Sequence, residues 1–167
     1  MAQVIKIPKI DAVLSGMVAF GLGHIVYILG LLDLAREAGL ENHAIIQASL
    51  VIWWIIAFVL WLVLIMLPAK EKRGILHYAA LPYALLLAST TALACALAVQ
   101  DGGLILVAIG AILFLLSDLL LAMHLFNDTY FPLIDDVVWL LYGPGQMLIV
   151  YGVVIFGLGI SKRLLGL

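Results

Sequence analysis

The chain has 167 residues, of which 66% are hydrophobic and 11% are charged, with a mean hydropathy of +1.27. Soluble globular domains are typically about 45–50% apolar and about 25% charged, so the composition excludes an ordinary soluble domain. The formal net charge of −2 excludes the basic surface that holds nucleic acid. We therefore expect residues 1–167 to form a single integral membrane domain.

Five apolar runs are long enough to cross a bilayer as helices, which takes about 20 residues each. They cover approximately 12–34, 44–66, 76–99, 104–126 and 136–160. The connections are short, and the sequence lacks the period-2 alternation of a membrane β-strand. The sequence predicts an all-α membrane protein, a bundle of about five transmembrane helices, with its two ends on opposite sides of the membrane.

The flanking charges predict an orientation. Pro68 and the charged cluster that follows it are expected to close the second run. Five basic residues fall on the side of the N-terminus: Lys6, Lys9, Lys70, Lys72 and Arg73. Three fall on the other side: Arg36, Lys162 and Arg163. Because positive charge is enriched on the cytoplasmic side, we expect the N-terminus inside, in a multi-pass protein of the cell membrane.

Polar side chains interrupt three of the apolar runs. The first carries His24 and Tyr27, the fourth carries Ser117 and Asp118, and the fifth carries Tyr142 and Gln146. An ionisable group inside a membrane is costly, so it indicates a functional site by default. At 1.5 Å per residue these groups lie roughly 9 to 18 Å from the same side. We therefore expect His24, Asp118 and Gln146 to share one interior cavity.

Helical spacing places these groups on defined faces. Phe20, His24 and Tyr27 follow one another at i, i+4 and i+7 and share a face of the first helix. Trp139, Tyr142 and Gln146 do the same in the fifth helix. Because proline removes a helical hydrogen bond, Pro144 is expected to kink that helix and open a cavity beside Gln146.

Structural roles explain some of these polar residues equally well. His24, Tyr142 and Gln146 could each bond to a neighbouring helix. Ser117 is expected to bond the carbonyl four residues before it. A structural role fits Asp118 less well, because a membrane carboxyl is more expensive than an amide and no Lys or Arg lies within the apolar runs.

Metal and nucleophile motifs are absent from the sequence. The four histidines form no H-x-x-x-H or H-E-x-x-H pair: His24, His43, His77 and His124. A zinc site would need distant residues such as His24, His77, His124 and Asp118 to converge, so we expect no metal and no cofactor. Cys95 is the single cysteine, so no intrachain disulfide is expected, and its apolar surroundings favour a small core residue over a nucleophile.

Three segments, in order, resemble the lysoplasmalogenase (YhhN-like) membrane proteins. Residues 20–27 look like the family's F-x-x-G-H-x-x-Y element, and residues 110–118 resemble its G-x-x-x-F-x-x-S-D helix. Residues 142–149 are similar to its terminal Y-x-x-x-Q-x-L-I. The resemblance spans roughly residues 13–158. It implies an enzyme that cleaves the vinyl ether bond of lysoplasmalogens, giving a fatty aldehyde and a glycerophospho-alcohol.

Family members are usually longer, with about eight helices and a Gly-Asp pair before the G-H-x-x-Y element. Here the acid upstream of that element is Asp11, which follows Ile10. By this resemblance the chain is an N-terminally short member that matches the family's last five helices. A non-catalytic lipid-binding or scaffold protein of the same family is the first alternative. The second is a small transporter, although the sequence shows no inverted halves with matching broken helices.

The resemblance assigns chemistry to the polar residues. Vinyl ethers hydrolyse by protonation on carbon, which suits Asp118 as general acid. His24 is the second candidate catalytic residue; His24, Tyr142 and Gln146 remain alternatives for steadying the cation or positioning water. The candidate substrate-binding residues are Tyr27, Ser117, Tyr142 and Gln146. The expected partners are the lysolipid substrate and membrane lipids, no nucleic acid is expected, and a homo-oligomer is left open.

Overall fold

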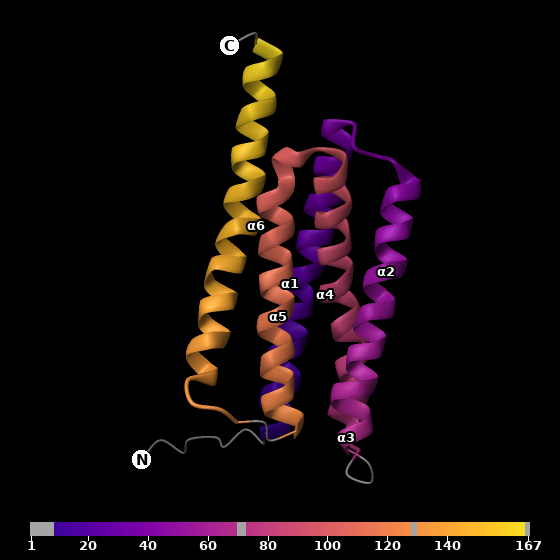
Figure 1. The fold of residues 1–167 in the computed structure, drawn as a ribbon, viewed down its shortest axis with the longest axis vertical. Coiled ribbons are helices and arrows are strands. Elements are labelled where there is room, and N and C mark those ends of the chain that lie inside the picture. The colour runs from indigo at the N-terminus through magenta and orange to yellow at the C-terminus, as the bar shows by residue number, and fades with distance from the viewer. Residues whose placement is uncertain (1–8, 70–72, 128–129, 166–167) are drawn as a thin grey trace.

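The computed structural model describes residues 9–69, 73–127 and 130–165, and all regular structure within these ranges is helical (Figure 1). The elements are α1 (Lys9–Ala38), α2 (His43–Trp61), the π-helix η1 (Leu62–Met66), α3 (Leu67–Ala69), α4 (Ile75–Gln100), the 3₁₀-helix η3 (Gly102–Leu104), α5 (Ile105–Asn127) and α6 (Ile134–Leu165). Helices α2, η1 and α3 continue one another, as do η3 and α5. Five helical segments among the described residues are therefore long and apolar enough to cross a membrane.

The predicted membrane spans are confirmed, with differences at their ends. The start of α1 and the end of α6 lie at opposite ends of the bundle, as expected (Figure 1). Helix α1 runs to Ala38 rather than Leu34 and stops at Gly39, whose φ of +68° favours glycine. The Leu40 N–H then donates to the Ala35 oxygen at 2.8 Å, which closes the helix end.

The helix of the second span continues through Pro68 to Ala69, the last described residue before the charged cluster that was expected, with Pro68, to close it. The chain widens into a π-turn, in which the Leu67 N–H donates to the Leu62 oxygen, and the helix continues to Ala69. The wider turn changes the hydrogen-bonding partners around Pro68, which has no N–H to donate. Lys6, Lys70 and Lys72, on which the predicted orientation depends, lie outside the described residues.

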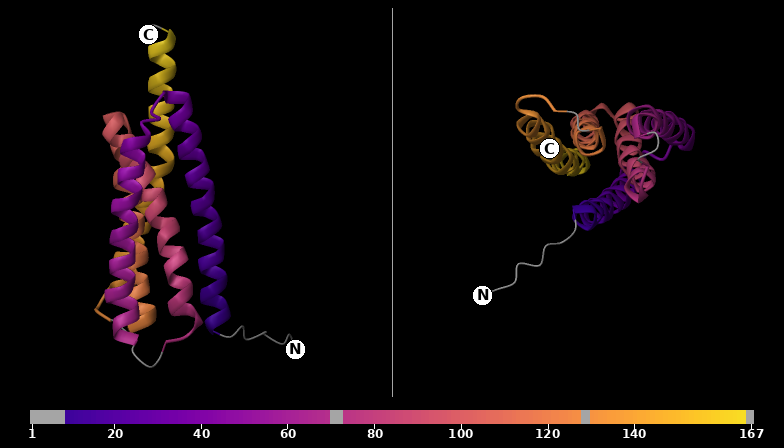
Figure 2. Two further views of the ribbon diagram at one scale, coloured as in Figure 1. Left: turned by 90° about the vertical axis from the view of Figure 1, so that its right-hand side faces the viewer. Right: turned by 90° about the horizontal axis from the view of Figure 1, so that it is seen from below.

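Helix α4 is the centre of the bundle. It packs against α1, α2 and α5, and α6 covers the far side of α5 (Figure 2). Three hydrogen bonds tie α2 to α4. Ser49 Oγ donates to the Ala92 oxygen at 2.8 Å, and Trp54 Nε1 donates to Ser89 Oγ at 2.9 Å. Trp61 Nε1 donates to the His77 oxygen at 2.8 Å. Interhelical hydrogen bonds of this kind hold helices together where lipid supplies no hydrophobic driving force.

Helices α5 and α6 meet backbone to backbone at glycines. A Cβ added to Gly110 would lie 2.7 Å from the Gly145 oxygen and 2.8 Å from the Ile149 nitrogen. A Cβ added to Gly152 would lie 2.8 Å from Val107 Cγ2. Small residues let two membrane helices approach this closely and gain van der Waals contact. This seam fixes α5, and with it the position of Asp118.

The best-packed core lies in one half of the bundle. Leu97, Leu104 and Ile149 are at most 2% exposed and belong to one contiguous cluster. Cys95 is partly buried and packs against that cluster, so its predicted core role is confirmed. Large apolar side chains such as Leu158, by contrast, are exposed on the outer face, where a membrane protein meets lipid acyl chains.

Candidate functional site

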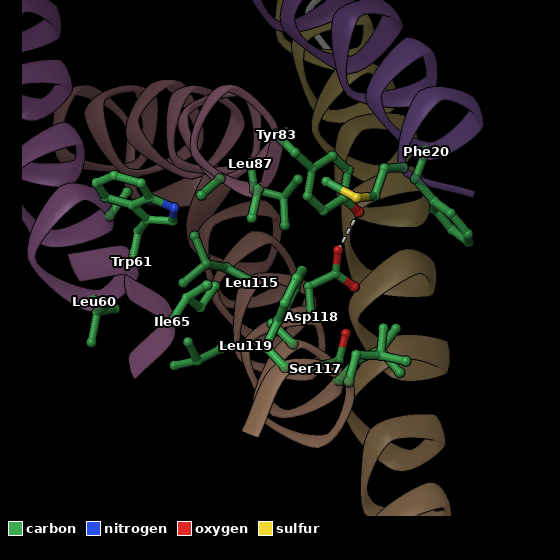
Figure 3. Close-up of a pocket in the computed structure, with 18 of the residues that line it drawn as sticks. Phe20, Leu60, Trp61, Ile65, Tyr83, Leu87, Leu115, Ser117, Asp118 and Leu119 are labelled. Carbon is green, nitrogen blue, oxygen red and sulfur yellow. Dashed lines mark hydrogen bonds between the residues drawn. The ribbon is translucent and has the colours of Figure 1, made fainter. Parts of the chain in front are cut away.

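A cavity of about 610 Å³ occupies the other half of the bundle, where α1 begins and α5 ends (Figure 3). All five membrane-crossing segments line it, mainly with alkyl and aromatic side chains such as Leu60, Ile65 and Leu115. The acidic residues in its lining are Asp118, deep on α5, and Asp135, at the start of α6. The site is therefore a mainly apolar chamber with a carboxyl group well inside it.

Asp118 is held by a residue that the sequence analysis missed. Tyr83 of α4 donates its hydroxyl proton to Asp118 Oδ2 across the cavity (Figure 3). Asp118 lies nine residues before the end of α5 and Tyr83 eight residues after the start of α4. Both are therefore about 12–14 Å inside their helices, at matching depth. Pro82-Tyr83, a polar ring beside a helix-interior proline, was the available sequence signal.

Ser117 lies in the wall of the same cavity, but its hydroxyl is already hydrogen-bonded within α5. It is fully buried and donates to the Phe114 oxygen at 2.7 Å. The expected partner was the carbonyl four residues earlier, and the observed one is three residues earlier. A serine hydroxyl on a helix reaches either carbonyl, depending on its rotamer, so sequence does not decide between them.

A second, smaller cavity of about 320 Å³ lies beside α1. It is lined by Phe20, Gly23, His24, Val26, Tyr27, Phe114 and Gln146. Tyr27 of α1 donates its hydroxyl proton to Gln146 Oε1 of α6, so the polar faces of these two helices meet here. A cavity does lie beside Gln146, although α6 remains one helix through Pro144.

His24 lies in the wall of this small cavity and is 2% exposed. Its Nδ1 atom lies 2.9 Å from Thr90 Oγ1 of α4, which is the bond to a neighbouring helix that the structural alternative for His24 described. Its ring stands edge-on to Phe114, with centroids 4.7 Å apart. Within the described ranges, Nε2 of His24 has no hydrogen-bond partner. The residue is thus anchored at one nitrogen and unpaired at the other.

The prediction of one shared cavity is wrong. Asp118 lines the large cavity, whereas His24 and Gln146 line the small one, and Phe20 lines both. An aromatic cluster packs at this boundary: Phe20 lies 6.3 Å from Phe114 and 6.0 Å from Tyr142 between ring centroids. Polar groups at the same depth in the membrane can lie on opposite sides of such a cluster, and depth is all that the sequence gives.

The remaining site residues divide between the two cavities. Tyr142 lines the large cavity, one turn before Gln146 in the small one. Among the residues that the structure describes, no three His, Cys, Asp or Glu side chains gather closely enough to hold a metal ion. His24, His77, His124 and Asp118 therefore do not assemble the donor set of a zinc site.

Comparison with protein-family models finds one described as the YhhN family, which matches residues 4–153. The match covers most of the chain, including both cavities. Comparison with curated proteins and with solved structures gives no match.

Proposed function

Because the chain belongs to the YhhN family, we propose that it is a membrane-embedded hydrolase that cleaves the vinyl ether bond of lysoplasmalogens. The products are a fatty aldehyde and a glycerophospho-alcohol. The observation that carries the proposal is Asp118, a carboxyl group oriented by Tyr83 inside a large apolar cavity of a membrane protein. The cell membrane is the proposed location.

The large cavity suits a single-chain lipid. Its volume of about 610 Å³ is in the range of small-molecule sites, roughly 300–1,000 Å³. Side chains such as Leu119, Leu125 and Phe126 can pack against an alkyl chain. The cavity runs from Asp118 to Asp135 at the end of the bundle, so a headgroup can stay near the membrane surface. The vinyl ether bond lies just below the headgroup, at a depth comparable with that of Asp118.

The slow step of vinyl ether hydrolysis is proton transfer to carbon, which needs an undissociated acid. A carboxyl group surrounded by apolar side chains resists ionisation, because a bare charge is costly there. Asp118 donates its proton to the alkene carbon farther from the ether oxygen, and the π electrons form the new C–H bond. Tyr83 holds Oδ2 and so orients the carboxyl group toward the substrate.

The resulting oxocarbenium ion then reacts with water. Water adds to the carbon bound to the ether oxygen, and the hemiacetal then collapses to aldehyde and alcohol. Tyr142 lines the cavity and is the proposed polar contact for the substrate. Ser117 also lines it, with its hydroxyl bonded to the Phe114 oxygen, and is proposed to contact the substrate only by packing. Tyr27, His24 and Gln146 form the polar group in the neighbouring small cavity.

Replacement of Asp118 by Asn tests the proposal. Asn keeps the size of the side chain but has no acidic proton, so aldehyde release should fall by at least about 100-fold, the lower range of general acid catalysis. The melting temperature in detergent should be unchanged or slightly higher, because a carboxyl group whose burial destabilises the fold has been removed. Asp136→Asn is the matched control, since Asp136 is exposed at the start of α6 and outside the cavity lining.

Asp118→Asn activity within about threefold of wild type would remove Asp118 from any acid role. Wild-type protein that binds lysolipid but releases no aldehyde would instead support the non-catalytic lipid-binding alternative, which uses the same cavity. Tracer flux in proteoliposomes without aldehyde release would support a transporter.

A further inference from the structure

The contacts of the Thr90 hydroxyl indicate which ring nitrogen of His24 carries the proton. Thr90 is 1% exposed, and its hydroxyl lies 3.3 Å from the Leu86 oxygen as well as 2.9 Å from His24 Nδ1. A hydroxyl has one hydrogen, and a carbonyl oxygen can only accept. The two contacts are both hydrogen bonds only when the Thr90 hydrogen goes to Leu86, as is usual for threonine inside a helix, and His24 Nδ1 donates to Thr90 Oγ1.

A neutral imidazole carries one N–H, so protonation at Nδ1 leaves a lone pair at Nε2. A doubly protonated ring would bury a positive charge beside a neutral threonine, with no carboxylate bonded to either nitrogen among the described residues. His24 thus carries a buried, unpaired acceptor on a side chain that lines the small cavity. An unpaired acceptor of this kind is costly, so a hydrogen-bond donor is expected to bind there.

The small cavity has the size and polarity to hold that donor as water. Its volume is about 320 Å³, and a water molecule needs about 30 Å³ and two to four polar partners. Gln146 Oε1 already accepts from Tyr27, so the amide NH₂ of Gln146 is oriented as a donor. His24 Nε2 accepts, Gln146 donates, and the Tyr27 oxygen can accept a second bond.

We infer that Thr90 fixes the tautomer of His24, so that Nε2 accepts a hydrogen bond from water held in the small cavity. In the reaction, which rests on the proposed function, this water passes Phe20, the residue that lines both cavities, and adds to the oxocarbenium carbon in the large cavity. The carboxylate of Asp118 takes a proton from the water as the water oxygen bonds to that carbon. Asp118 then gives a proton to the departing glycerol oxygen and regains one from the hemiacetal hydroxyl as the aldehyde forms.

The tautomer can be measured without substrate. We would label the histidines with ¹⁵N in the full-length protein, record nitrogen spectra in detergent micelles, and assign the His24 signals by their loss in His24→Gln. Wild type and Thr90→Ser should show a protonated Nδ1 and an unprotonated Nε2. Thr90→Val removes the acceptor, so His24 should shift toward protonation at Nε2. A wild-type ring protonated at Nε2 overturns the inference, as does a Thr90→Val spectrum identical to wild type.

Aldehyde release then tests the catalytic part. For histidines that bind a metal, the partner that fixes the tautomer contributes about 10- to 100-fold. By analogy, Thr90→Val should lose about 10-fold or more, and Thr90→Ser should restore the activity. Equal activity in wild type and Thr90→Val overturns the role in catalysis. A protonated Nδ1 in a wild-type protein with no aldehyde release contradicts the proposed function and leaves the tautomer standing. If Thr90→Val does not fold, the wild-type and Thr90→Ser spectra still decide the tautomer.

Discussion

The two halves of the bundle are built in opposite ways. In the closed half, which contains Leu97, Leu104 and Phe156, buried side chains form one continuous core. In the open half, which contains Ala57, Asp118 and Ala122, the same helices surround a cavity of about 610 Å³. The aromatic cluster around Phe114 lies between them. The closed half holds the helices together, so the open half need not fill its own interior.

Residue size accounts for much of the difference. Alanines of α4 that point into the closed half are almost completely buried, among them Ala92 and Ala94, and glycines bring α5 and α6 into backbone contact. In the open half larger side chains, such as Trp61, Tyr83 and Leu119, stand among small ones such as Ala57 and Ala122. Small side chains let helices approach, whereas large ones keep them apart.

The largest expected effect comes from filling the open half. Ala122→Trp should place an indole ring in the lipid-tail space beside Asp118. Displacing about four methylene groups at roughly 0.8 kcal/mol each predicts a loss of about 200-fold in kcat/KM. The melting temperature in detergent should change little, because the indole ring enters an existing cavity. Leu158→Trp, on the lipid-exposed face of α6, is the control. Full activity of Ala122→Trp would show that substrate does not use this cavity.

The second-largest effect is expected from a substitution in the closed half. Gly110→Ala should lower the free energy of unfolding by about 1–3 kcal/mol, the cost of overpacking, because the new methyl group meets backbone atoms of α6. Gly30→Ala is the control: a Cβ there meets nothing within 4 Å, and alanine favours helix by about 1 kcal/mol. Thermal melting in detergent measures both. Equal melting temperatures of Gly110→Ala and Gly30→Ala would mean that α5 and α6 leave room for a methyl group at Gly110.

The smallest effect concerns the orientation of Asp118. Tyr83→Phe removes one hydrogen bond, worth about 1 kcal/mol, so aldehyde release should fall roughly fivefold while melting stays near wild type. Tyr78→Phe, on the exposed face of the same helix, should have no effect. A loss as large as that of Asp118→Asn would instead indicate that Tyr83 takes part in proton transfer itself.

The sequence predicted the five spans because hydropathy and length follow from composition alone. It also identified Asp118 and Gln146, since a polar residue in an apolar run is conspicuous. It missed Tyr83 and Thr90, which matter only because α4 is the central helix. The run Ser89-Thr90-Thr91 hinted at polar bonds on α4 but named no partner. Helix neighbours depend on packing of side chains from all five spans, and periodicity within one span does not contain that information.

The π-turn at Leu62–Met66 has a consequence for the shape of the cavity. Trp53 and Ile65 both line it, yet they are twelve residues apart. In an unbroken α-helix twelve residues amount to a net rotation of about 120°, so Ile65 would turn away from the surface that Trp53 occupies. The wide turn holds more residues per revolution and takes up part of that rotation. One helix can therefore keep a single continuous wall against the cavity over its whole depth.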